Sequence, residues 1–102
     1  HINEIKSVIV EDGITGLGKS SFYKSTSIQS VKLADSVRSI GEMCFFRNGS
    51  LEKIELGNGL TSIGEAAFSV SNLKKVSLPA GITRIEADTF YGCKQLESKK
   101  HW

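Results

Sequence analysis

Hydrophobic residues recur along this chain at a fixed interval. Four segments align from Ile5, Ile28, Leu51 and Leu73, so successive segments start 23, 23 and 22 residues apart. Each segment has an apolar residue at the same six positions, and chance at 39% hydrophobic content does not produce such an array. The pattern therefore indicates an internal repeat. The positions are Ile5, Val8, Val10, Ile14, Leu17, Phe22; Ile28, Val31, Leu33, Val37, Ile40, Phe45; Leu51, Ile54, Leu56, Leu60, Ile63, Phe68; Leu73, Val76, Leu78, Ile82, Ile85, Phe90.

Each repeat predicts the same succession of short elements. Alternating apolar residues, as at 8–10 and 54–56, predict a strand with one face turned inward. A turn follows, at steps such as Asn58-Gly59, and a second extended piece such as 61–63 comes next. The stretch 65–68 then makes a helical turn or an irregular segment that carries the phenylalanine into the core.

One such repeat cannot bury its apolar side alone, so we expect the repeats to stack in register with equivalent strands ~4.8 Å apart in a parallel sheet. The four phenylalanines should then lie in single file. Glycine follows the fifth apolar position in three repeats, and Glu86 takes that place in the fourth. An antiparallel sandwich stays open as an alternative, because Asp-Gly and Asn-Gly steps are also hairpin signals. A sandwich, however, gives no reason for a phenylalanine every 22 or 23 residues.

The length allows one domain at most, since the chain has 102 residues. We divide it into repeats 5–27, 28–50, 51–72 and 73–95. Residues 96–102 are a partial repeat, a cap or a tail, because Lys99 and His101 fall where the array requires apolar residues, whereas Leu96 and Trp102 could cover the last repeat. The chain starts with His1 and offers little cover at either end. We therefore expect a piece of a longer array, or end-to-end self-association.

The repeats resemble a known family. Residues 51–68 read Leu-x-x-Ile-x-Leu and then Leu-x-x-Ile-Gly-x-x-Ala-Phe, which is similar to the BspA-like leucine-rich repeat of bacterial and protist surface proteins. The fourth copy departs at Glu86 but regains the family's Gly92-Cys93. The resemblance implies an α/β fold class, namely a right-handed leucine-rich-repeat solenoid with a parallel sheet on its concave side and short helical turns or irregular segments on its convex side. It also implies a non-enzymatic protein-binding role, often in adhesion, at the cell surface or in a secreted protein.

Composition and charge exclude several classes of partner. Thirteen Lys and Arg against eleven Asp and Glu give a net charge of +2, far from the concentrated basic surface that nucleic-acid binding requires. The longest apolar run is about three residues, Val8-Ile9-Val10, so no segment is expected to insert into a membrane.

Residues 13–20, Gly-Ile-Thr-Gly-Leu-Gly-Lys-Ser, match the phosphate-loop pattern G-x-x-x-x-G-K-[ST] and follow an apolar strand. That chemistry needs a long helix after the lysine, and the polar segment 20–27 is a poor helix former. Ile14, Leu17 and Phe22 also already occupy repeat positions. Nucleotide binding is therefore kept only as a remote alternative.

The sequence lacks the groups of residues that catalysis or metal binding would need. The two histidines, His1 and His101, lie at opposite ends of the chain, so no Ser-His or Cys-His pair is expected within the repeats. No ligand cluster has metal spacing, and carboxylate pairs such as Glu52 and Glu55 are more typical of solvated charges. We expect no enzyme activity, no metal and no cofactor.

The two cysteines occupy small-residue positions of different repeats. Cys44 stands where the third repeat has Ala67, and Cys93 stands where the first has Ser25. The second and fourth repeats lie ~9.6 Å apart in a stack, beyond the ~7 Å that a disulfide can bridge. We therefore predict two free, buried thiols.

Surface residues give the candidate binding site. On the outward side of the first strands, one column contains Ser7, Ser30, Lys53 and Lys75, and the next contains Ile9, Lys32, Glu55 and Ser77. A third column follows the phenylalanines and contains Tyr23, Phe46, Ser69 and Tyr91. The lysines suit an acidic protein partner or are a solvated face, and the aromatic residues form a binding ridge or are packing. The candidate partner-binding residues are Lys32, Lys53, Glu55, Lys75, Tyr23, Phe46 and Tyr91.

The sequence thus favours a protein-interaction module that binds an unknown protein partner. A structural spacer without a partner of its own is the main alternative.

Overall fold

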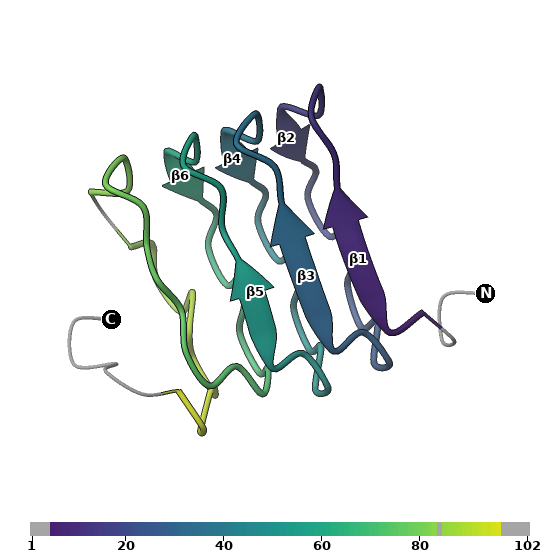
Figure 1. The fold of residues 1–102 in the computed structure, drawn as a ribbon. Coiled ribbons are helices and arrows are strands. Elements are labelled where there is room, and N and C mark those ends of the chain that lie inside the picture. Colours follow the sequence, from purple (N-terminus) through teal and green to yellow (C-terminus); the bar gives the residue numbers. More distant parts are fainter. Residues whose placement is uncertain (1–4, 84, 97–102) are drawn as a thin grey trace.

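The protein is a stack of coils, each made by one repeat, in the computed structural model, which describes residues 5–83 and 85–96 (Figure 1). Within these residues, six short strands form two parallel sheets of three strands each, ordered β1-β3-β5 and β2-β4-β6. We call them the first and the second sheet. The strands are β1 (Ser7–Val10), β2 (Gly16–Leu17), β3 (Ser30–Leu33), β4 (Ser39–Ile40), β5 (Lys53–Glu55) and β6 (Ser62–Ile63).

The register of both sheets follows the sequence interval. Val8 pairs with Val31, which pairs with Ile54, and in the second sheet Ile40 lies between Leu17 and Ile63. Residues one repeat apart therefore lie side by side, which confirms the stacked arrangement. The antiparallel alternative is wrong, because every strand pair is parallel.

The core is a file of phenylalanine rings flanked by aliphatic side chains. Ring centroids are 5.2 Å apart for Phe22 and Phe45, 5.4 Å for Phe45 and Phe68, and 5.7 Å for Phe68 and Phe90, with the rings within 9° of parallel. The single file expected from the sequence is confirmed. Phe45 and Phe68 are fully buried, whereas Phe22 in the first coil is half-buried.

The first coil buries less than the coils behind it. Ile5 and Ile14 are 40% and 47% exposed, although Ile28 and Val37, their equivalents in the second repeat, are fully buried. The difference arises because each coil is covered by its neighbours, and the described residues place no coil before the first. The expected covering role of Leu96 and Trp102 falls partly outside the described residues; Leu96 itself is buried.

The third side of each coil consists of tight turns. We call it the turn face: residues 18–25, 41–48, 64–71 and 86–93. Of the two conformations left open by the sequence, the structure has the irregular one: Ala67 N donates to Gly64 O (3.2 Å) and Ser69 N donates to Ala66 O (3.2 Å). Ala66 has a φ of 58°, and positive φ recurs at the same two positions of every repeat. A positive φ is incompatible with a right-handed helix, so these residues form turns. No described residue is helical.

Backbone hydrogen bonds also join neighbouring coils along the turn face. Phe22 N donates to Cys44 O (2.9 Å), and one repeat later Phe45 N donates to Ala67 O (2.8 Å). Nine such bonds occur in the described part of the chain, and each runs from the earlier coil to the later one. The turn face is therefore a third hydrogen-bonded layer beside the two sheets.

Glycine sets how closely the second sheet can stack. A Cβ on Gly64 would lie 2.4 Å from Glu42 N, and a Cβ on Gly41 would lie 2.7 Å from Gly18 C. The fourth repeat has Glu86 in place of glycine at this position. Within residues 5–83 and 85–96 no fourth-repeat strand joins β6, and the first sheet continues only as a single parallel bridge between Lys53 and Lys75.

Candidate interaction surface

The solvent side of the first sheet, which we call the open face, carries the two columns predicted from the sequence. Ser7 pairs with Ser30, Ser30 with Lys53, and Lys53 with Lys75. In the second column Lys32 lies between Ile9 and Glu55. The strands hold these side chains outward because the alternate residues, such as Val31 and Ile54, are buried in the core.

The character of the open face changes from one end to the other. In the first coil it presents Ser7 and Ile9, whose side chain is 69% exposed. By the third and fourth coils it presents Lys53, Glu55 and Lys75, which are all exposed. Lys53 and Lys75 are direct cross-strand neighbours, an arrangement in which like charges repel.

A hollow of about 620 Å³ lies on the open face between the third and fourth coils. We call it the lysine hollow. It contains three lysines and two glutamates beside apolar and hydroxyl side chains, so its lining carries a net positive charge. The lining residues are Glu52, Lys53, Ile54, Glu55, Leu56, Lys74, Lys75 and Ser77.

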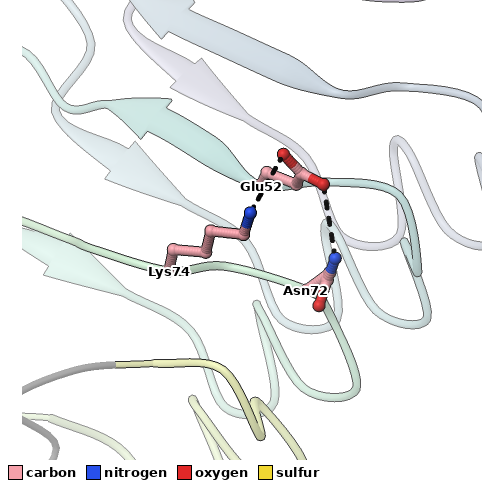
Figure 2. Close-up of polar contacts among 3 residues, drawn as sticks. All are labelled: Glu52, Asn72 and Lys74. Atoms are coloured by element: carbon pink, nitrogen blue, oxygen red, sulfur yellow. Dashed lines mark hydrogen bonds and ion pairs between the residues drawn. The ribbon is translucent and has the colours of Figure 1, made fainter.

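One acidic residue of the hollow is already engaged (Figure 2). Lys74 Nζ lies 3.7 Å from Glu52 Oε1, and Asn72 Nδ2 donates to Glu52 Oε2 at 3.5 Å. Sequence reasoning did not find this cluster. The signal was present, because positions 52 and 74 are one repeat apart and opposite charges there lie on adjacent coils.

The predicted aromatic column is not continuous. Tyr23 and Phe46 stack with centroids 5.5 Å apart, but Ser69 is buried and interrupts the column before Tyr91, which is 68% exposed. The stacked pair is covered by cations from its own turns, Lys24 Nζ 5.4 Å from the Tyr23 centroid and Arg47 Cζ 5.7 Å from the Phe46 centroid. The structure thus brings together two of the three candidate rings, and their faces are largely occupied by internal contacts.

The phosphate-loop match forms ordinary parts of the first coil. Its residues 16–17 are β2, which pairs with β4, and its lysine, Lys19, lies 3.4 Å from a carboxylate oxygen of Glu42. Gly13 N donates to Ser36 Oγ (3.1 Å), and Ser20 has a φ of 58° in a turn. The segment after the lysine is therefore a turn and not a helix, so it lacks the helix N-terminus that holds phosphates.

Both thiols are free and buried, as predicted. Burial raises the pKa of the Cys44 thiol to about 11 from an ordinary 9.0, despite opposing hydrogen bonds from Phe22 and Ser21. The Cys93 thiol donates to Phe68 O (3.0 Å) and lies 3.3 Å from Ser71 Oγ. Neither position suits a reactive nucleophile, because both sulfur atoms are buried and a reactive cysteine is partly exposed.

Two kinds of feature are absent from the described residues. No group of three or more His, Cys, Asp or Glu residues among them could hold a metal ion. They also contain no helix long and apolar enough to cross a membrane.

Comparison with known proteins identifies the repeat. A family model described as a BspA type leucine-rich repeat region, with six copies, matches residues 1–101. The chain belongs to this leucine-rich-repeat family. The resemblance of its repeats and the solenoid fold expected from them are thereby confirmed. No protein of curated function matches the chain.

Solved structures of bacterial leucine-rich-repeat proteins are similar to this leucine-rich-repeat chain. A leucine-rich cell surface protein from Faecalibacterium prausnitzii is 34% identical with a TM-score of 0.84 over 89% of this chain and 24% of that one. A leucine-rich repeat protein from Eubacterium ventriosum is 26% identical with a TM-score of 0.82 over 89% of this chain and 24% of its own. A leucine-rich repeat protein from T. pallidum is 25% identical with a TM-score of 0.67, over 90% of this chain and 59% of its own.

The chain spans about a quarter of the length of the first two of these proteins.

Proposed function

We propose that the chain is a non-enzymatic protein-interaction segment of a larger cell-surface or secreted protein, and that its open face makes the contact. One observation carries the proposal: exposed Lys32, Lys53 and Glu55 are held by the paired strands β3 and β5 on one side of the first sheet, and a parallel bridge places exposed Lys75 beside Lys53. Rigid strands present such side chains at fixed positions, which favours specific recognition. The cell-surface description of the Faecalibacterium protein supports the location.

A structural spacer is the second candidate function. It is favoured by the Glu52–Lys74 ion pair and by the cations over Tyr23 and Phe46, because these contacts satisfy exposed side chains within the chain itself. A spacer needs stacked coils but no partner of its own.

A binding screen distinguishes the two functions. The chain is immobilised, and its binding to purified extracellular proteins is measured by biolayer interferometry. Two charge-reversal variants are compared with it: Lys32→Glu, which changes the open face, and Lys94→Glu, which lies outside the open face and is the control. We expect a partner that loses affinity for Lys32→Glu and keeps it for Lys94→Glu. A wild-type chain that binds none of the proteins supports the spacer.

A further inference from the structure

We infer that the lysine hollow binds an acidic segment of a partner protein, with Lys53 and Lys75 as the residues that receive its carboxylates. The inference rests on the proposed function and names the chemistry of the partner. The parallel bridge between Lys53 and Lys75 places two exposed lysines side by side on adjacent coils of the open face. In a parallel sheet such neighbours are ~4.8 Å apart, and their repulsion is relieved when an anion lies between them.

The acidic residues nearby do not supply that anion. Glu52 directs one oxygen to Lys74 at 3.7 Å and the other to Asn72 at 3.5 Å (Figure 2). Glu55 is the cross-strand neighbour of Lys32, one column away from Lys53. In the described part of the chain neither Lys53 nor Lys75 has an ion-pair partner within 4.0 Å. Neither lysine is therefore neutralised by a direct ion pair with a described residue.

The size and lining of the hollow can accommodate a short polypeptide segment. A volume of about 620 Å³ is far larger than one small anion needs and lies within the ~300–1,000 Å³ of typical ligand sites. Leu56, which is half-buried, adds an apolar side chain to the lining, and Ser77 adds a hydroxyl. Backbone amides and short apolar groups of a bound segment fit these neighbours, while its carboxylates meet the lysines.

The flanking glutamates argue against a continuous polyanion. Glu52 and Glu55 lie on either side of Lys53 in the sequence and line the same hollow. A nucleic acid carries a phosphate at every step and would be repelled by both carboxylates. A protein segment can place its carboxylates at the two lysines and neutral residues beside the glutamates.

The test uses a fluorescein-labelled peptide of alternating glycine and glutamate with three glutamates, and the same peptide with glutamine as a neutral control. Binding to the full chain is followed by fluorescence anisotropy in 20 mM NaCl and in 200 mM NaCl. The key variant is Lys53→Ser with Lys75→Ser, which places in this column the residue found at Ser7 and Ser30. Its matched control, Lys24→Ser with Lys94→Ser, removes the same net charge elsewhere. Circular dichroism verifies that both variants fold.

We expect the glutamate peptide to bind, with about fivefold to tenfold weaker affinity in the hollow variant, because two exposed ion pairs of up to ~1 kcal/mol each are lost. The control variant should change affinity less than about twofold, and 200 mM salt should weaken binding. Equal losses in the two variants, or tighter binding of a ten-nucleotide oligothymidylate than of the peptide, would overturn the inference.

The two proposals fail in different ways. If the hollow variant loses a protein partner found in the screen but the glutamate peptide does not bind, the acidic chemistry is wrong and the binding function stands. If no partner is found and the peptide binds both variants equally, both proposals are wrong.

Discussion

The ring of Phe45 lies 5.4 Å from the ring of Phe68 and within 5° of parallel. Both rings are fully buried, and each is provided by the same position of its repeat. Every internal ring of the file is therefore covered on both faces by rings of neighbouring coils, which gives the stack dense contacts along its axis.

Phe45→Ala should destabilise the protein strongly, because it removes a ring enclosed on both faces. We expect a loss of about 3–5 kcal/mol in the free energy of unfolding, measured by urea denaturation. Phe22→Ala is the matched control, since Phe22 is half-buried and stacks on one described neighbour. Equal losses for the two variants would contradict the importance of enclosure.

Gly64→Ala should also destabilise the stack, because the added Cβ would lie 2.4 Å from Glu42 N on the neighbouring coil. We expect a loss of at least about 1–3 kcal/mol. Gly49→Ala is the control: a Cβ there has nothing within 4 Å, so stability should stay within about 0.5 kcal/mol. Thermal and urea unfolding of the two variants measure the difference, and a tolerated Gly64→Ala would disprove the close approach.

The pairing register of the two sheets could be predicted, because residues one repeat apart in the sequence are the ones that pair. Equal spacing of the phenylalanines was enough to place Phe22 against Phe45, and the same interval contains the signal for the Glu52–Lys74 pair. The turn face could not be predicted, because Ala66 and Val70 have positive φ although both carry a Cβ. Glycine is the residue usually found at such positions, and here hydrogen bonds between neighbouring coils hold other residues there, as between Val70 N and Tyr91 O (2.7 Å).

The candidate site was predicted in part. The columns that contain Lys53 and Lys75 follow from alternation along each strand. Ser69 already stood in the predicted third column, so that break between aromatic residues was visible in the sequence. The burial of Ser69, whose hydroxyl donates to Tyr91 O (3.1 Å), was not. The exposure of Ile5 and Ile14 was missed because burial at these positions depends on a coil on either side.

Ionisation of Cys44 should lower the free energy of unfolding at alkaline pH. Its pKa is about 11 in the folded chain against an ordinary 9.0, so the folded state holds the proton more tightly. The resulting stabilisation is fully present below pH 9 and is lost as the pH rises to 11, by roughly 3 kcal/mol. Cys44→Ala, which places the residue found at Ala67, should show a flatter profile in urea denaturation between pH 9 and 11. Parallel profiles would show that burial does not hold this thiol neutral.

Glu52→Gln should hardly change stability. The ion pair with Lys74 is solvent-exposed, so we expect a loss of less than about 1 kcal/mol in urea denaturation. The same change removes a negative charge from the lysine hollow, and the glutamate peptide should then bind more tightly by a few fold. Glu65→Gln, an exposed glutamate on the turn face, is the control for the change in net charge. An unchanged peptide affinity would place the binding site elsewhere.

Magnesium-ATP should not bind the segment 13–20. Lys19 is oriented toward Glu42, and the residues after it form a turn. Isothermal titration calorimetry with the wild-type chain should therefore show no binding heat. Micromolar binding that disappears in Lys19→Ala would restore the nucleotide alternative.

The one-way hydrogen bonds of the turn face give the stack a chemical polarity. Each coil offers N–H groups to the next coil and carbonyl oxygens to the previous one, so the two ends of the stack are unlike. A further coil, or a second molecule joined through these bonds, can add only head to tail, because joining like ends would set donor against donor. Association through this layer is therefore heterologous, and it would build a ring or an open filament rather than a twofold-symmetric dimer.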